Sequence, residues 1–130
     1  MFLHRQGTTL VEMALTLPIL FLFVFAAVEF GRANMIRHFA QNAAYEGARA
    51  GIVPGATTAI VQTAAQNILQ ISGVQDGTVT VTPAVLGPND TEITIDVSVP
   101  FDTNSFFVPL FLAGRNLQTT CTLSTEVTGL

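Results

Sequence analysis

A long apolar run near the N-terminus constrains this chain more than any other feature of its sequence. Residues 10–30 are apolar except for Glu12, Thr16 and Glu29. A helix needs roughly 20 residues to cross the hydrocarbon core of a bilayer, within a range of about 17–25. The length of the run therefore predicts a single membrane-spanning helix over residues 8–30, whose transmembrane side chains include Leu10, Phe21, Phe25 and Val28.

Charged residues are few and unevenly distributed. They make up 11% of the 130 residues, whereas a typical soluble domain carries about 25%. Residues 1–51 hold four arginines against three glutamates, whereas residues 52–130 hold one arginine against six carboxylates, and the chain has no lysine. Nucleic-acid binding needs clustered cations that displace counterions, so this balance argues against a nucleic-acid partner.

An acid near the start of the apolar run distinguishes it from an ordinary signal peptide. The run is longer than the usual apolar region of a signal peptide, about 7–15 residues. The pair Ala26-Ala27 is a poor cleavage site because Val-Glu-Phe follows it directly. An acid at the bilayer centre costs about 2.5–3.5 kcal/mol on insertion scales, so Glu12 suggests a function and a partner. The alternative is that Glu12 merely reaches the membrane interface near the start of the span.

Two motifs around this run carry a family resemblance. Gly7 followed by Thr-Thr-Leu-Val-Glu resembles the cleavage motif of type IV pilins, in which a peptidase cuts after a glycine and a glutamate becomes the fifth mature residue. Val-Glu-Phe-Gly-Arg, with Gln-Asn-Ala-Ala-Tyr-Glu-Gly-Ala-Arg-Ala-Gly further along, resembles the TadE-like family. Those proteins are the minor pilins, or pseudopilins, of the Tad (Flp) pilus and secretion system. The resemblance covers residues 5–51 and extends beyond them only in layout.

The resemblance implies a structural subunit rather than an enzyme. Prepilin peptidase would cut between Gly7 and Thr8, so residues 1–7 would be a leader peptide. The implied partners are membrane lipid, other pilin subunits, the Tad assembly machinery and the peptidase. The implied location is the bacterial cell membrane, with the head outside the cytoplasm. This orientation rests on the resemblance, because Arg5 precedes the span while Arg32 and Arg37 follow it, and cations alone favour the opposite direction.

Processing after Gly7 would change the electrostatics of the helix start. It would create an α-amine on Thr8, and Glu12 lies four residues later, about 6 Å along a helix and on the same face. The helix dipole also favours a carboxylate in the first turn. The two opposite charges would stabilise each other within one chain or between neighbours. The resemblance implies that Glu12 docks a new subunit by meeting the N-terminal amine of its neighbour.

The helix is expected to continue beyond the membrane as a stalk over residues 31–53. Pro18 removes one backbone hydrogen bond inside the span and predicts a kink. Pro54 and Gly55 end the helix. One face of the stalk consists of small residues, which allow close helix packing. The packing partner is either the head of the same chain or another subunit. This face contains Ala40, Ala43, Ala44, Gly47, Ala48 and Gly51.

Residues 54–130 predict a small α+β head. Residues 56–72 form an expected amphipathic helix with Ile60, Val61, Ala64, Ala65, Ile68 and Ile71 on its apolar side. Strands are expected over residues 78–82, 92–99 and 117–127, where apolar and polar residues alternate. This alternation predicts an antiparallel sheet of about three strands with one solvated face. The inward-facing residues would be Val79, Val81, Ile93, Ile95, Val97, Val99, Leu117, Thr119, Cys121, Leu123 and Val127.

An apolar segment over residues 105–113 lies between the last two expected strands. It contains Phe106, Phe107, Leu110 and Phe111 and is too short to span a membrane. Covering the open end of the sheet is the default expectation. Exposure of these side chains would instead indicate an interface, with the membrane surface or with a partner subunit.

The sequence lacks the motifs of an enzyme. Its two histidines are His4 and His38, and neither accompanies a nucleophile motif. No phosphate-binding loop or metal-ligand spacing is present, and one cysteine, Cys121, excludes an intrachain disulfide. We therefore expect no catalytic residue, cofactor or metal. The alternative to a pilin is an uncleaved single-pass binding module in the cell envelope, in which the Gly7-to-Glu12 spacing is accidental.

Overall fold

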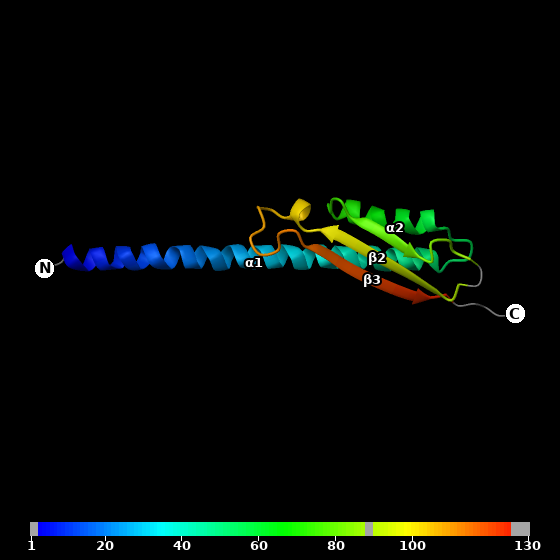
Figure 1. Cartoon of the computed structure of the whole chain (residues 1–130), viewed down its shortest axis with the longest axis horizontal. Coiled ribbons are helices and arrows are strands. Elements are labelled where there is room, and N and C mark those ends of the chain that lie inside the picture. Colours follow the sequence, from blue (N-terminus) through cyan, green and yellow to red (C-terminus); the bar gives the residue numbers. More distant parts are fainter. Residues whose placement is uncertain (1–2, 88–89, 126–130) are drawn as a thin grey trace.

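One long helix runs through most of the molecule, and the other elements form a head at its C-terminal half (Figure 1). The computed structural model describes residues 3–87 and 90–125, with side chains from residue 7 onward. The predicted α+β class is confirmed, with a long N-terminal apolar helix, a second helix and a three-stranded antiparallel sheet. The elements are α1 (Leu3–Gly51), α2 (Thr58–Ile71), β1 (Thr78–Thr82), β2 (Glu92–Pro100), the 3-10 helix η1 (Asp102–Asn104) and β3 (Asn116–Ser124).

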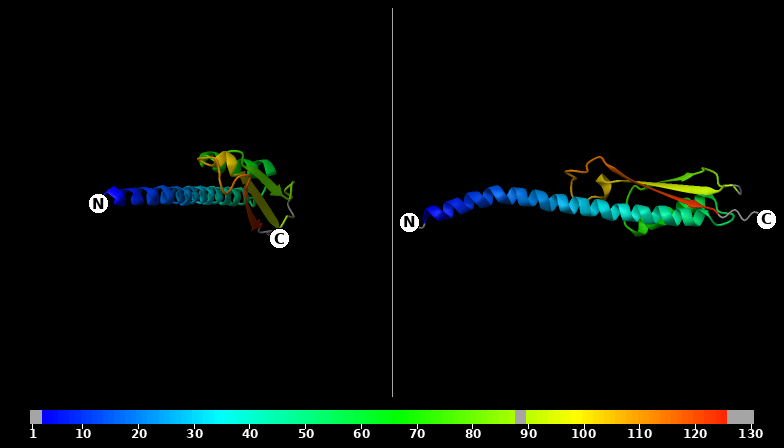
Figure 2. Two further views of the ribbon diagram at one scale, coloured as in Figure 1. Left: turned by 60° about the vertical axis from the view of Figure 1, so that its left-hand side comes forward. Right: turned by 90° about the horizontal axis from the view of Figure 1, so that it is seen from below.

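The N-terminal half of α1 projects alone from the rest of the chain. Figure 2 shows the helix axis bending within its blue N-terminal third, the part that contains Pro18. Proline inside a helix lacks the amide that would bond to the preceding turn, so a bend here has a local cause. The Thr16 hydroxyl donates to the backbone oxygen of Glu12 at 2.9 Å. Thr16 therefore supports the turn before the proline.

The sheet has the order β1-β2-β3, and both pairs are antiparallel. The registers place Val81 opposite Ile95 and Ile95 opposite Cys121. Residues on this side of β1 and β2 are buried, whereas the opposite side of the sheet carries threonines and acids. On that polar side, the hydroxyl oxygens of Thr94 and Thr122 lie 2.8 Å apart. The predicted sheet with one solvated face is therefore present.

Both helices cover the apolar face of the sheet. α1 lies against β2 and β3, and α2 runs back beside α1 and reaches β1. Residues Ala40, Ala43, Ala44 and Ala48 of α1 are fully buried. A Cβ added at Gly47 would lie 3.1 Å from the Cβ of Ala65 on α2. Small residues thus bring the two helices close together within this chain.

The C-terminal half of α1, expected as a stalk that packs either on the head or on another subunit, packs within this chain. Ala33 and Ile36 are already buried, so residues 33–51 of α1 belong to the core of the head rather than to a separate spacer. Whether a helix face is buried depends on which other elements pack against it. The composition of the helix alone does not identify those elements. The head is built on the C-terminal half of α1.

Two residues of α2 were assigned to the wrong face. Ile60 and Ile71 were predicted to face the core, yet 52% and 85% of their surfaces are exposed. The buried residues are Val61, Ala65 and Leu69, spaced four apart along one stripe. Because residues 60 and 71 are apolar, the predicted buried face of α2 was wider than the face that α1 and β1 actually cover. Val127, predicted to face inward on the last strand, lies outside the described residues, and β3 ends at Ser124.

Candidate functional site

The exposed part of α1 is the first half of the candidate site. Residues 7–25 are exposed, including Leu10, Phe21 and Phe25, and Val28 follows at 40% exposure. In the described part of the chain, one helix, spanning Gly7–Gly51, is long and apolar enough to cross a membrane, and its most apolar window is not buried within the molecule. Apolar side chains around a helix require an apolar surrounding. This N-terminal helix therefore has the properties of a membrane anchor.

The predicted cleavage and assembly residues all lie on this exposed helix. Gly7 is helical, and a Cβ added there meets no atom within 4 Å. Thr8 follows on the same turn, and Glu12 lies one turn further with an exposed side chain. Residues four apart on a helix are neighbours on one face, so Thr8 and Glu12 lie close enough to interact.

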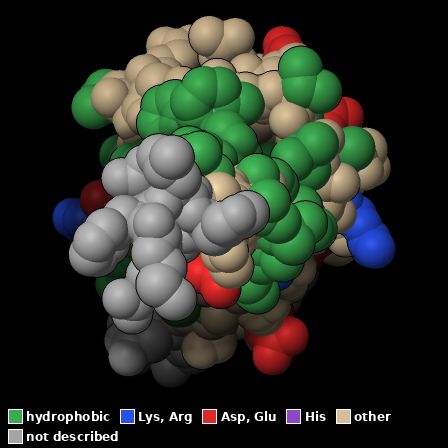
Figure 3. Space-filling model, turned by 90° about the vertical axis from the view of Figure 1, so that its left-hand side faces the viewer, with side chains coloured by type: hydrophobic (Ala, Val, Ile, Leu, Met, Phe, Trp, Pro, Cys, Tyr) green, Lys and Arg blue, Asp and Glu red, His purple; other side chains and the backbone are tan. Residues whose placement is uncertain are grey.

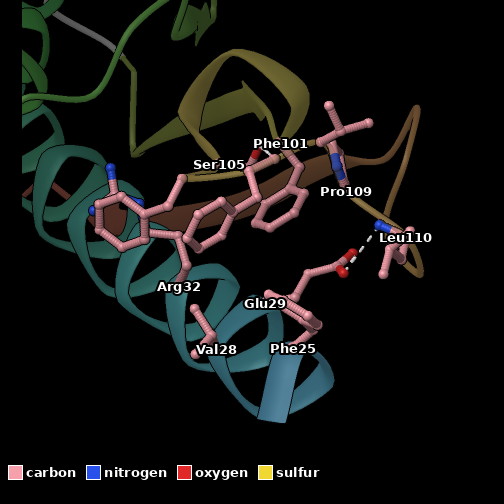
Figure 4. A pocket seen from close by; sticks show the side chains of 11 residues that line it. Phe25, Val28, Glu29, Arg32, Phe101, Ser105, Pro109 and Leu110 are labelled. Carbon is pink, nitrogen blue, oxygen red and sulfur yellow. Dashed lines mark hydrogen bonds between the residues drawn. The ribbon is translucent and has the colours of Figure 1, made fainter. Parts of the chain in front are cut away.

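The second half of the site is the loop between η1 and β3, residues 105–115, which lies beside α1 at the end of the head nearest the anchor (Figure 2). Glu29 of α1 binds this loop through three backbone amides. Its carboxylate accepts hydrogen bonds from the nitrogen of Leu110 at 3.1 Å, of Phe111 at 2.9 Å and of Leu112 at 2.5 Å. Figure 4 shows the Glu29 side chain extending from α1 toward Leu110. Glu29 therefore holds the loop against the helix.

Arg32 supplies a second attachment one turn further along α1. Its Nε donates to the backbone oxygen of Asn104 at 2.8 Å, and its guanidinium carbon lies 4.6 Å from the ring centroid of Phe106. A guanidinium over an aromatic face is attracted by the ring quadrupole. The arginine predicted to flank the membrane span is thus also bound to the head.

Asn104 is the buried polar residue of this region, with 4% of its surface exposed. Its side-chain Nδ2 donates to the backbone oxygens of Gln75 at 2.8 Å and Pro100 at 2.9 Å. Its Oδ1 accepts from the backbone nitrogen of Gln75 at 2.8 Å. Asn104 therefore connects the end of β2 to the segment after α2. Its backbone oxygen accepts the hydrogen bond from Arg32, so Arg32 is attached to a residue that is itself held in place.

Aromatic pairs complete the contact between the loop and α1. The rings of Phe25 and Phe107 meet edge to face with centroids 6.1 Å apart, and those of Phe30 and Phe111 stack at 6.2 Å. Such offset pairs contribute about 0.5–1.5 kcal/mol beyond their buried area. These contacts fix the loop at the level of the last two turns of the apolar run.

The cavity between loop and helix is small. It measures about 30 Å³ and is lined by residues that include Phe25, Glu29, Phe101 and Pro109 (Figure 4). That volume accommodates roughly two water molecules, far less than a metabolite needs. Within the described residues, no group of three or more histidine, cysteine or acidic side chains is placed to hold a metal ion.

The loop leaves its apolar side chains exposed. Phe106, Phe107 and Leu110 are exposed over 64–65% of their surfaces and Phe111 over 45%. Figure 3 views the molecule from the N-terminal end of α1 and shows hydrophobic side chains on the face seen from that end. The segment thus covers part of the open end of the core through Leu112, while most of its large side chains face outward.

Comparison with known proteins adds one decisive observation. Residues 7–49 match the family model of the TadE-like proteins. This match confirms the resemblance found in the sequence. The TadE-like region begins at the predicted cleavage glycine and ends two residues before the end of α1, so it contains the whole exposed helix and the helix part of the head core. A search of the curated proteins found no match, and neither did a search of the solved structures.

Three residues of the site were not assigned by sequence reasoning. Glu29 and Arg32 act on backbone groups that lie 72–83 positions away along the chain, and Asn104 was part of an unassigned loop. One signal pointed to Glu29, because a second acid in an apolar run needs hydrogen-bond donors nearby. The identity of those donors was not encoded in any local pattern.

Proposed function

We propose that this chain is a minor pilin, or pseudopilin, of a Tad-type pilus or secretion system. In this proposal a prepilin peptidase cuts after Gly7, and the chain is inserted with its head outside the cytoplasm. The subunit then joins other pilins through α1. The observation that carries the proposal is the match to the TadE-like family model, within which residues 7–25 form an exposed apolar helix.

The exposed helix supports an assembly role because it offers a large apolar surface to lipid or to other helices. A protein that only needed an anchor could use any apolar helix. This one places an acid, Glu12, one turn after the residue that would become the N-terminus. In an apolar surrounding the new amine of Thr8 would offset the cost of that acid. A neighbouring subunit could supply the amine equally well, which couples charge neutralisation to docking.

The first test is the N-terminus of the mature protein. Sequencing or mass spectrometry of protein from cells with active prepilin peptidase should find Thr8 as the first residue. Gly7→Val should prevent processing while leaving the fold unchanged, since a Cβ at Gly7 meets nothing within 4 Å. Gly31→Val is the matched control, because Gly31 also lies in α1 facing open space. Mature protein that retains residues 1–7 would favour the uncleaved binding module instead.

The second test concerns Glu12. Glu12→Ala should abolish incorporation into pili while membrane insertion remains intact, because the variant removes a charge from an exposed helix face without disturbing the head. Glu12→Gln keeps the shape and should fail in the same way if charge is the property that matters. Met13→Ala, which truncates an exposed neighbour, is the control and should still be incorporated. Normal incorporation of Glu12→Ala would remove this residue from the mechanism.

A further inference from the structure

The loop over residues 105–113 has the features of a second membrane contact. Its outward-facing residues Phe106, Phe107, Val108, Leu110 and Phe111 are all large and apolar, and Val108 is 85% exposed. A contiguous apolar patch of this kind on a small head marks an interaction surface. The loop that carries this patch lies at the end of the head nearest the exposed part of α1 (Figure 2).

The backbone of this loop is prepared for an apolar surrounding. The amides of three consecutive residues, Leu110, Phe111 and Leu112, donate to the Glu29 carboxylate. The backbone oxygen of Phe107 accepts from the Ser105 hydroxyl at 2.5 Å. Irregular backbone tolerates contact with hydrocarbon only where its polar groups are satisfied internally. Three amides and one carbonyl oxygen of the loop are thus bonded within the chain, while its large apolar side chains are exposed.

The position of the loop along α1 matches the edge of a bilayer. Residues 10–30 would extend roughly 31 Å as a helix, close to the thickness of about 30 Å of the hydrocarbon core. The loop touches this run at Phe25, Glu29 and Phe30, which belong to its last two turns. If the run fills the core, the loop lies at the boundary between hydrocarbon and headgroups.

Arg32 marks the polar side of that boundary. It lies two residues beyond the run, with its guanidinium carbon 4.6 Å from the Phe106 ring centroid and its Nε bound to the backbone oxygen of Asn104. Arginine side chains near the ends of spans place their apolar stem toward lipid and their charge toward the headgroups. A cation at this level suits the phosphates of lipid headgroups.

We propose that residues 105–113 and the last two turns of the apolar run of α1 form one lipid-contacting collar, with the loop side chains inserted at the edge of the hydrocarbon core. Lipid is favoured over a neighbouring subunit because the patch is continuous with α1 residues Phe25 and Phe30, which lie in the apolar run and contact the loop directly. Any acyl chain that covers those two rings also reaches Phe107 and Phe111. The collar would fix the depth of α1 and the height of the head.

This inference rests on the membrane span of the proposed function but not on processing after Gly7 or on assembly into a pilus. The N-terminus of the mature protein tests processing separately, so failure of one proposal is distinguishable from failure of the other.

Two matched valines allow a direct test in the full chain. Val108 in the loop and Val85 at the opposite end of the head are exposed to 85% and 82%. In a Cys121→Ala background, Val108→Cys and Val85→Cys would each carry one environment-sensitive fluorophore. The proteins would be inserted into vesicles of phosphatidylcholine and phosphatidylglycerol. Quenching by brominated acyl chains would be compared with quenching by aqueous iodide.

The label at position 108 should be quenched several-fold more by brominated lipid than the label at position 85, and several-fold less by iodide. Equal access of iodide to both labels would overturn the proposal. Nanodiscs that hold one copy of the chain separate lipid from a partner subunit. Protection of position 108 should persist there, and its loss at one copy per disc would assign the patch to another subunit and also overturn the proposal. Phe107→Cys provides a second reporter should Val108→Cys fold poorly.

Discussion

Glu29 is the residue on which the position of the loop depends most directly. Glu29→Ala leaves the amides of Leu110, Phe111 and Leu112 without their shared acceptor. A hydrogen bond to a charged group contributes about 1.5–3 kcal/mol. We expect hydrogen exchange at these amides in detergent-solubilised protein to accelerate about tenfold or more, while exchange in β2 stays unchanged.

A second glutamate of α1 is the control for this experiment. Glu46 forms an ion pair with Arg49 at 3.1 Å, and 39% of the Glu46 side chain is exposed. Exposed pairs of this kind contribute about 0–1 kcal/mol. Glu46→Ala should therefore leave exchange in the loop unaltered. Equal protection of the three loop amides in Glu29→Ala and in the unmodified chain would show that the carboxylate does not hold the loop.

Asn104 is a second residue whose substitution has a clear expected effect. Its side-chain amide is buried, and both its oxygen and its nitrogen form hydrogen bonds. Asn104→Asp preserves the size of the side chain but replaces the Nδ2 donor, leaving the oxygens of Gln75 and Pro100 facing another oxygen. Buried groups that lose their partners cost about 1–3 kcal/mol each. We expect the free energy of unfolding, measured by chemical denaturation in detergent, to fall by at least about 2 kcal/mol. Asn116→Asp, at an exposed position that begins β3, should change it by less than about 0.5 kcal/mol.

Substitutions at two glycines of α1 should have opposite effects, because one glycine lies in open space and the other is packed against α2. A Cβ at Gly31 meets nothing within 4 Å, so Gly31→Ala should stabilise the chain by about 0.5–1 kcal/mol through helix propensity. A Cβ at Gly47 lies 3.1 Å from Ala65 and 3.4 Å from the Val61 oxygen. Gly47→Leu should destabilise it by about 1–3 kcal/mol or more, because neither neighbour is a flexible side chain that can move aside. Thermal unfolding of both variants measures the contrast, and equal melting temperatures would contradict the close packing of α1 and α2.

The elements themselves follow from local patterns in the sequence. The strict alternation around Ile93, Ile95, Val97 and Val99 identifies β2 and its inward face, because a strand turns successive side chains to opposite sides. The helix signal is equally direct in α1. In α2 the pattern is weaker, since apolar Ile60 and Ile71 blur the edge of the stripe that is actually buried. Which strip of an apolar helix is covered depends on its neighbours in space.

The candidate site was predictable only in its first half. Gly7, Thr8 and Glu12 lie within six positions of one another, so a motif could identify them. The loop attachment joins Glu29 to residues more than 80 positions away, and Asn104 joins β2 to a turn after α2. Such contacts are set by tertiary packing and leave no periodic trace. The apolar character of residues 105–113 indicated an interface, but its placement beside the span required the fold.

The molecule as a whole is a head built on the second half of its own anchor, so the two parts are not independent. A chain reduced to residues 26–130 keeps Ile36, the buried alanines of α1 and the Glu29 attachment, and should fold in mild detergent with a cooperative unfolding transition. A chain reduced to residues 52–130 loses that entire side of the core. The sheet and α2 would then expose residues such as Ile93, Ile95 and Val61, which are at most 2% exposed in the intact chain. Apolar side chains of this size contribute about 1.5–3 kcal/mol each when buried, and small domains have only about 5–15 kcal/mol of total stability.

We therefore expect the shorter chain to lack dispersed amide resonances and a cooperative transition, as measured by NMR and circular dichroism. A cooperatively folded 52–130 chain would show that α1 is an appendage to the head rather than part of its core, and that the head could move relative to the membrane independently of the helix.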